Sequence, residues 1–80
     1  MDIVKGSVVK SRAGRDKDEF FVVLDVKDSL AYIANGRDRK VEKPKLKNLK
    51  HLAATNAILS LPATNKQLRK MLKEFGNQED

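Results

Sequence analysis

Apolar runs in the first two thirds of the chain predict short β-strands separated by polar turns. Residues 6–11 (GSVVKS) put two valines directly after a glycine, which is typical of a strand that starts from a turn. Residues 13–19 are polar and charge-dense and predict a loop. Residues 20–26 (FFVVLDV) are continuously apolar at their start, which predicts a strand covered on both faces. Residues 29–35 (SLAYIAN) predict a third strand, with Leu30, Tyr32 and Ala34 on one face and Ala31 and Ile33 on the other.

The dipeptide Asn35-Gly36 predicts a hairpin, because both residue types tolerate the positive φ angles of a type I′ turn. Residues 37–43 would then supply the returning strand, which ends before the proline that follows. Residues 49–53 are a candidate for one more short strand, and residues 51–62 stay open between strand and turn. Four or five short strands in about fifty residues predict a small antiparallel barrel or curled sheet.

The C-terminal third changes to a helical period. Thr64 followed three residues later by Gln67 has the spacing of a capping box, and Gly76 stands where a helix C-cap is expected. These signals predict a helix over residues 65–75. Its apolar stripe consists of Leu68, Met71, Leu72 and Phe75. Its other faces carry Lys66, Arg69, Lys70 and Lys73. Because so small a sheet needs cover, we expect this stripe to dock on the barrel rather than to bind a partner.

Length and composition limit the chain to one small domain without covalent reinforcement. Eighty residues bury too little surface for two cores. The absence of cysteine excludes disulfides and thiolate metal sites. The N-terminal residues show no signal-peptide pattern and no stretch is apolar enough for a membrane span, so we expect a cytoplasmic protein. Within the single domain, residues 1–62 are predicted to form the barrel, and residues 63–80 the helix and a polar tail packed on it.

The positive charge is concentrated in one segment. Residues 1–36 carry six basic and six acidic side chains, whereas residues 37–52 carry seven basic and two acidic ones. The remaining residues, 53–80, carry four basic and three acidic side chains. A general requirement for solubility gives no reason for such clustering, whereas a binding site for a polyanion does. The segment lacks the bulky apolar face of a membrane-surface helix, which favours nucleic acid over an anionic membrane.

Residue constellations for catalysis are nearly absent. With one histidine and no cysteine, a Cys/His nucleophile pair and a Cys/His zinc site are excluded. Ser29 or Ser60 with His51 has no flanking pattern of a nucleophile elbow. The acids of residues 16–19 lie beside basic residues, balance their charge and lack the spacing of a calcium loop. We therefore expect neither an enzyme nor a cofactor, metal or small-molecule substrate.

The basic segment contains groups suited to phosphate. Arg37 and Arg39 follow the predicted turn, where guanidinium groups can bind phosphate in a bidentate manner. In an extended segment, three alternate lysines project to the same side, and we expect these side chains to face the solvent. These lysines are Lys43, Lys45 and Lys47. The apolar side chains expected to anchor the segment to the barrel are Val41, Leu46, Leu49 and Leu52.

Aromatic residues give little sign of a base-stacking platform. The chain has four of them, and Phe20, Phe21 and Phe75 stand in apolar contexts that predict core packing. Tyr32 is the best candidate for an exposed ring. We therefore expect binding by charge and shape, which suits structured RNA better than sequence-specific duplex DNA.

The segment GSVVKSRAGRDKDEFFVVLDV, residues 6–26, resembles a KOW motif: a glycine-led strand, a loop with a key glycine, here Gly14, and a hydrophobic second strand. Residues 34–52 (ANGRDRKVEKPKLKNLKHL) are similar to the continuation in small bacterial KOW-domain RNA-binding proteins. The chain thereby resembles the family of ribosomal protein fourteen of the archaeal and eukaryotic large subunit. The similarity covers about residues 3–52. The loop departs from the motif, since acids stand where a glycine commonly precedes the second strand.

The resemblance implies a small SH3-like antiparallel barrel that binds RNA, typically ribosomal RNA, with ribosomal proteins as further partners. Gly14 would allow a tight turn or a close approach of the backbone to phosphate. The implied contacts in and before the first loop are Lys10, Ser11, Arg12, Ala13, Gly14, Arg15 and Lys17. Those of the second basic element are Arg37, Arg39, Lys40, Lys43, Lys45, Lys47, Asn48, Lys50 and His51.

A second function stays open from the sequence. The chain can instead be a protein-interaction module of the translation or transcription machinery, which uses the barrel and the apolar stripe of the C-terminal helix. Truncation after Pro62 would distinguish the two, because a folded remnant that still binds RNA would free the helix for a partner, whereas global unfolding would mark the helix as part of the core.

Overall fold

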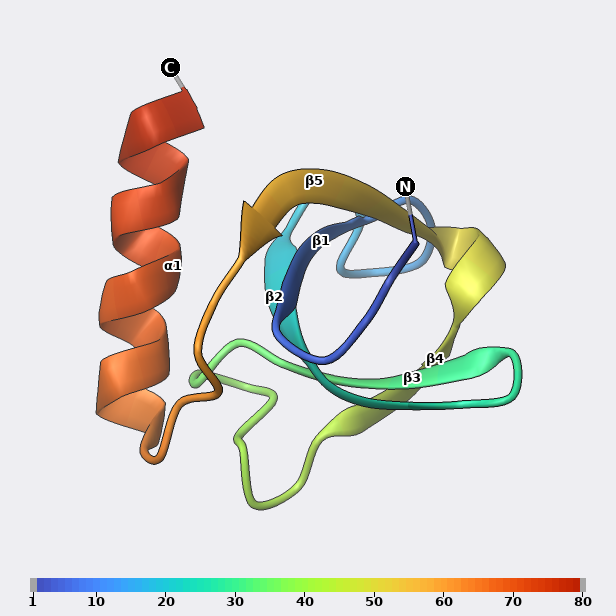
Figure 1. Cartoon of the computed structure of the whole chain (residues 1–80), viewed down its shortest axis with the longest axis horizontal. Helices are drawn as coiled ribbons and strands as arrows, with labels where there is room; N and C mark the ends of the chain where they lie inside the picture. Colours follow the sequence, from blue (N-terminus) through green and yellow to red (C-terminus); the bar gives the residue numbers. More distant parts are fainter. Residues whose placement is uncertain (1, 80) are drawn as a thin grey trace.

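A computed structural model describes residues 2–79 and contains five strands, a short 3₁₀ helix and one α-helix (Figure 1). In chain order the elements are β1 (Ser7–Ser11), β2 (Phe20–Lys27), β3 (Leu30–Ala34), β4 (Lys45–Asn48), η1 (Leu49–His51), β5 (Leu52–Ile58) and α1 (Asn65–Glu79). The predicted mainly β fold with a C-terminal helix is confirmed. None of the helices within the described residues is long and apolar enough to cross a membrane.

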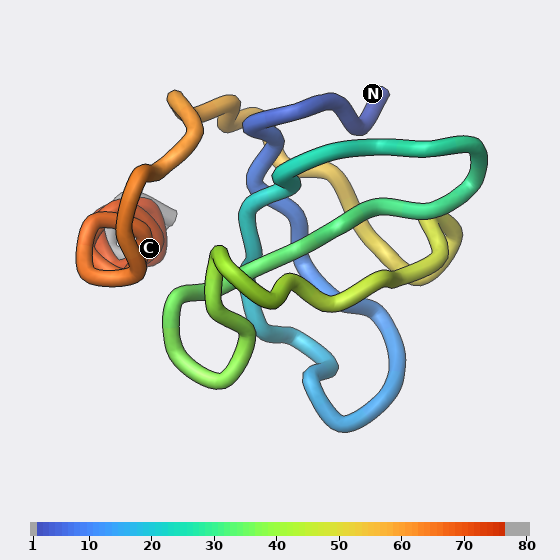
Figure 2. Tube along the Cα trace, turned by 90° about the horizontal axis from the view of Figure 1, so that it is seen from below, coloured from blue at the N-terminus to red at the C-terminus, as the bar shows by residue number. Residues whose placement is uncertain are grey.

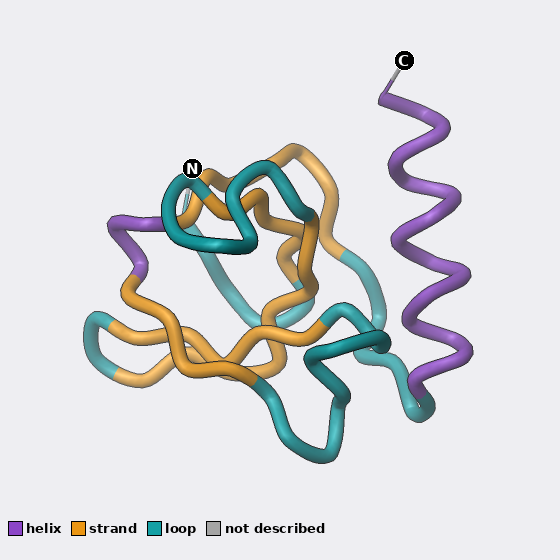
Figure 3. Tube along the Cα trace, turned by 180° about the vertical axis from the view of Figure 1, so that it is seen from behind, coloured by secondary structure: helices purple, strands orange, loops and turns teal. Residues whose placement is uncertain are grey.

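The five strands form one antiparallel sheet in the order β4-β3-β2-β1-β5. Register shifts interrupt two of the pairings, between Ser7 and Val9 on β1 and between Val23 and Asp25 on β2. Such bulges bend strands and increase their twist, and here they help the sheet to curl into an open SH3-like barrel. The edge strands β4 and β5 are linked by η1, which lies on the side of the barrel away from α1 (Figure 3).

The sheet buries side chains on both of its faces, as the apolar run of β2 predicts. Phe21 and Val23 point into the barrel, where they pack with Val9, Ala31, Ile33 and Leu52. Val22 points to the outer face, where it packs with Ala34 and with Leu68 of α1. We call these the inner and outer clusters. The helix therefore completes the outer cluster, and docking of its apolar stripe on the barrel is confirmed.

Helix α1 begins where the sequence predicts and ends later. The hydroxyl oxygen of Thr64 accepts a hydrogen bond from the backbone N–H of Gln67 at 3.1 Å. The side chain of Gln67 accepts one from the N–H of Ala63, one residue before the position expected in a capping box. Gly76 lies inside the helix, which extends to Glu79, so its predicted role as the C-cap is wrong.

The Asn35-Gly36 dipeptide does not form a two-residue hairpin, and residues 37–43 form no strand. The side-chain oxygen of Asn35 instead accepts hydrogen bonds from the N–H groups of Arg37 and Arg39. An asparagine side chain that bonds to the backbone in this way competes with strand pairing. β3 consequently leads into a loop of residues 35–44, and its partner β4 starts only after Pro44.

The segment that the sequence left open, residues 51–62, contains the long edge strand β5. The short strand predicted over residues 49–53 is wrong in its first half, because residues 49–51 form η1. Asn48 caps that turn, since its side chain accepts a hydrogen bond from the N–H of Lys50. A side-chain cap of this kind favours a tight turn over a strand.

Candidate nucleic-acid interface

A buried ion pair fastens the first loop, residues 12–19, to strand β4. The ammonium group of Lys47 donates to Asp16 Oδ1 at 2.8 Å, to the hydroxyl of Ser11 at 3.0 Å and to the carbonyl of Ala13 at 2.8 Å. An ammonium group has three N–H donors, so all of them are satisfied. The side chains of Lys47 and Asp16 are only 9% and 8% exposed. This arrangement makes Lys47 an internal structural residue.

Asp16 is held in its ionised form by its donors. Burial acts to raise the pKa of Asp16, but hydrogen bonds from Lys47, Ser11 and Lys45 outweigh it and hold the pKa well below its usual range. The second carboxylate oxygen lies 3.2 Å from the ammonium group of Lys45. We call Ser11, Asp16, Lys45 and Lys47 the loop clamp.

The clamp corrects the predicted orientation of β4. Lys45 and Lys47 do share one face of β4, but they turn toward Asp16 rather than toward solvent, and the third predicted lysine, Lys43, lies in the exposed loop before the strand. Leu46, expected to anchor the segment, is 48% exposed. The lysine face of β4 is buried because Asp16 and Ser11 offer hydrogen-bond partners for buried ammonium groups. These partners come from distant positions in the sequence. The other anchors pack as expected, Val41 against the outer cluster and Leu49 and Leu52 in the inner one.

The first loop reverses direction at Gly14, whose φ of +87° lies in the left-handed region that favours glycine. Its main chain is closed by hydrogen bonds from the N–H of Ser11 to the carbonyl of Glu19 and from the N–H of Asp18 to the carbonyl of Ser11. Arg12, Arg15 and Lys17 are all exposed on this loop. Gly14 thus has the conformation that the motif resemblance implies.

The clamp and one backbone bond bring the first loop beside the second basic element. The N–H of Arg12 donates to the carbonyl of His51 at 2.8 Å, next to exposed Lys50. The first loop and the loop of residues 35–44 also project on the same side of the barrel (Figure 2). Glu19 at the end of the first loop lines a recess together with Arg37. Two basic segments that are separate in the sequence therefore form one surface.

The loop of residues 35–44 is ordered by side chains rather than by strand pairing. Buried Asn35 donates to Asp38 at 2.9 Å and accepts from two backbone N–H groups. The hydrogen bond from Asn35 contributes most to lowering the pKa of Asp38, and a backbone hydrogen bond and the nearby charge of Arg39 lower it further. Arg37, Lys40 and Lys43 are exposed, and Arg39 is half-buried. The loop thus presents cations on a fixed backbone.

The predicted contact residues divide into three groups. Those accessible to solvent on the surface formed by the first loop and residues 35–51 are Arg12, Ala13, Gly14, Arg15, Lys17, Arg37, Arg39, Lys40, Lys43, Lys50 and His51. Ser11 and Lys47 are buried in the clamp and Lys45 is partly so, while Asn48 serves as the cap of η1. Lys10 lies apart on the outer face, with its ammonium group 5.6 Å from the centre of the Phe20 ring.

Sequence reasoning missed the contribution of α1 to the charged surface. A guanidinium nitrogen of Arg69 donates to the carbonyl of Gly36 at 2.6 Å, and Arg69 and Lys73 line the recess with Arg37. The ring of Phe75 packs edge-on against Phe20, with centroids 5.2 Å apart. Helical spacing identifies the apolar stripe, but only the docking geometry reveals which cations of the helix meet the barrel loops.

Among the described side chains, those of residues 2–76, no three His, Asp or Glu residues come together as a metal-binding cluster. The sequence matches no known protein-family profile and no curated protein.

Proposed function

We propose that the protein is a cytoplasmic, non-catalytic RNA-binding module that contacts structured RNA, ribosomal RNA above all, through the surface formed by its first loop and residues 35–51. The observation that carries the proposal is the loop clamp. By pairing Asp16 with Lys47 and Lys45, the clamp neutralises an acid of the first loop and sets that loop beside the second basic segment. The exposed cations that remain outnumber the acids on this surface.

The backbone that carries these basic residues is ordered, which suits phosphate recognition. Arg12 is fixed by its backbone bond to His51, and Arg37 by its bond to Asn35. Cations on an ordered backbone lose less conformational freedom on binding than those of a mobile tail. Each phosphate that they neutralise releases counterions, so the affinity must fall with salt. The KOW-like segment, residues 6–26, adds support because the resemblance implies RNA binding at the same loop.

The protein-interaction alternative has less support. It requires the apolar stripe of α1, but Leu68 is fully buried against Val22 and Ala34. Leu72 also packs on this outer cluster. Most of the stripe is therefore used within the chain.

The test is the salt dependence of binding to a labelled RNA stem-loop. We expect the double variant Arg12→Gln/Arg15→Gln to bind more weakly at low salt, with the slope of log K against log salt reduced by about one for each phosphate that the variant no longer neutralises. The control Lys5→Gln/Lys27→Gln removes the same charge at exposed positions outside the surface. Equal slopes for the two double variants would overturn the proposal, because the charge would then act without regard to its position.

A further inference from the structure

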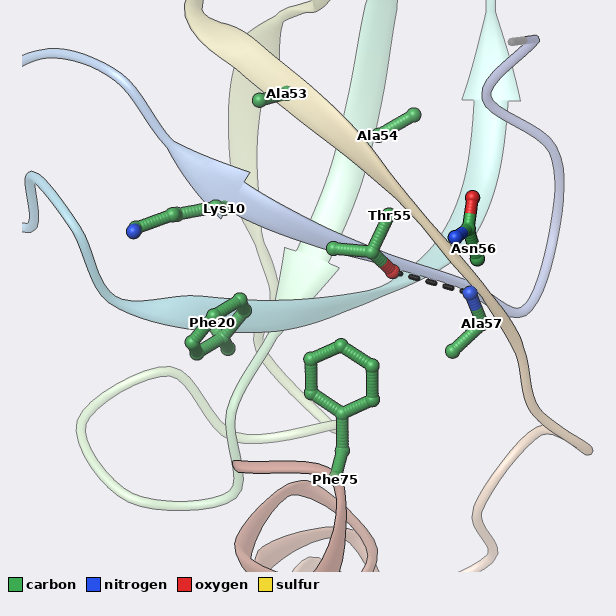
Figure 4. Close-up of a pocket in the computed structure, with 8 residues that line it drawn as sticks. All are labelled: Lys10, Phe20, Ala53, Ala54, Thr55, Asn56, Ala57 and Phe75. Atoms are coloured by element: carbon green, nitrogen blue, oxygen red, sulfur yellow. Dashed lines mark hydrogen bonds between the residues drawn. The ribbon is translucent and has the colours of Figure 1, made fainter. Parts of the chain in front are cut away.

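A groove lies where α1 leaves the outer face of the sheet uncovered. Strand register aligns Lys10 with Phe20 on one side and with Ala53 on the other, so the three side chains form a row across β2, β1 and β5. On β5, Thr55 and Ala57 point toward the ring of Phe75, and Ala53 lies farther along the strand (Figure 4). These residues line a groove of about 540 Å³ between β5 and the C-terminal half of the helix.

The walls of the groove suit a flat apolar ring. Small side chains on β5 leave the space above Phe75 open, whereas larger ones would fill it. The rings of Phe20 and Phe75 meet at 70°, and Phe75 presents its ring beneath the strand (Figure 4). The volume is within the range of about 300–1,000 Å³ that is common for sites of small ligands. The groove can therefore accept a planar group of the size of a nucleobase.

The surroundings of the groove are positively charged. The ammonium group of Lys10 stands at one end, over the Phe20 ring. On the other side of Phe20, a recess of about 230 Å³ is lined by Arg37, Arg69 and Lys73. Glu19 is the one acid among the residues that line the groove and the recess. Among the side chains of residues 2–76, no ion pair occupies these four cations.

We infer that this groove binds an unpaired nucleotide of single-stranded RNA. Its base lies against Phe75 and the small side chains of β5, and the neighbouring phosphates lie against Lys10 and the cations of the recess. Aromatic rings in a positively charged groove are the common means of binding single strands, because every base has a face that can stack. The inference rests on the proposed function and adds a substrate class, namely RNA with unpaired nucleotides beside a structured part. Arg37 borders both the recess and the loop surface, so one RNA can occupy the two.

The experiment measures fluorescence anisotropy with two probes, an unstructured oligoribonucleotide of about eight nucleotides and an RNA stem-loop with a closed, short loop. The variant Ala57→Leu fills the groove without changing the charge. The variant Phe75→Ala removes the ring. The matched control Ala63→Leu makes the same Ala-to-Leu change at an exposed position two residues before α1, whose first residue lies about 15 Å from Phe75 along the helix. Circular dichroism verifies that each variant is folded.

We expect Ala57→Leu and Phe75→Ala to weaken binding of the unstructured probe about tenfold or more, with Ala63→Leu unchanged and stem-loop binding kept by Ala57→Leu. If the stem-loop binds but Ala57→Leu leaves the unstructured probe unaffected, the inference is wrong while the proposed function stands. If neither RNA binds, both fail. Binding of a polyglutamate peptide as tight as that of the oligonucleotide, and equally sensitive to Ala57→Leu, would also overturn the inference, since the groove would then select acidic chains.

Discussion

Replacing Asp16 with alanine tests whether the loop clamp holds the first loop in place. The substitution removes the partner of Lys47 at 2.8 Å and that of Lys45 at 3.2 Å. Lys47 would keep the hydroxyl of Ser11 and the carbonyl of Ala13 but would remain a buried charge without a counterion. Because its side chain is only 9% exposed, water cannot replace the missing carboxylate without opening the loop.

The expected loss of stability follows from the cost of an unpaired buried charge. Removing one partner of a buried ion pair costs about 3–5 kcal/mol, and the two remaining acceptors of Lys47 favour the lower end, about 3 kcal/mol. A domain of this length has a free energy of unfolding of about 4–12 kcal/mol. The variant should therefore lose a large part of its stability. Lys47→Met should cost less, about 2 kcal/mol, because Asp16 keeps Lys45 and Ser11 as donors.

Urea unfolding followed by far-ultraviolet circular dichroism measures these changes. The double variant Asp16→Ala/Lys47→Met should lose less than the sum of the single losses, by more than about 1 kcal/mol, since both single variants break the same pair. Lys5→Ala is the control, because its ion pair with Asp25 spans 3.8 Å between exposed side chains; it should change stability by less than about 0.5 kcal/mol. A loss below about 1 kcal/mol for Asp16→Ala, with additive single variants, would refute the argument.

Three further predictions concern pH, glycine and the Asn35 loop. The pKa of Asp16 is lower in the folded protein than in the unfolded chain, so the unfolded chain binds more protons below about pH 4. The free energy of unfolding should therefore decrease as the pH falls below about 4. Unfolding measured over a series of pH values should show a smaller decrease for Asp16→Ala than for the wild type. Gly36→Ala should lose more than about 1 kcal/mol, because Gly36 has a φ of +79° and a Cβ would lie 2.6 Å from a backbone oxygen at the start of α1. Gly76→Ala should instead gain about 0.5–1 kcal/mol, because Gly76 is helical with open space around it, and equal effects at the two glycines in thermal unfolding would contradict this. Asn35→Ala should cost about 1–3 kcal/mol by leaving two partly buried backbone N–H groups without their acceptor. Asn48→Ala, at an exposed cap, should cost less, and the reverse order in urea unfolding would be evidence against the loop description.

The sequence predicted those features that depend on local periodicity. The apolar run of β2 indicated burial on both faces, and the inner and outer clusters confirm it. The spacing of Leu68 and its neighbours indicated a docked helix, which is also confirmed. In both cases the period alone determines which side chains share a face.

The errors arose where side-chain contacts, some with distant residues and some local, decide between backbone alternatives. The alternation of lysine and apolar residues in β4 indicates two faces but not which of them is buried. The ion pair of Lys47 with Asp16, thirty-one positions earlier, determines which face is buried. The side chain of Asn35 bonds to its own loop, which displaces the hairpin that its dipeptide favours. The groove beside Phe75 depends on how far α1 covers the sheet, and no sequence pattern specifies this.

Ultraviolet crosslinking in cells, followed by sequencing of the attached RNA, tests the central proposal most directly. The wild-type protein should crosslink to structured RNA, with ribosomal RNA enriched. A variant with four surface arginines changed to glutamine should lose most of this RNA. The four are Arg12, Arg15, Arg37 and Arg39. Recovery of the same RNA at the same level from the wild type and this variant, or of none from either, would contradict it.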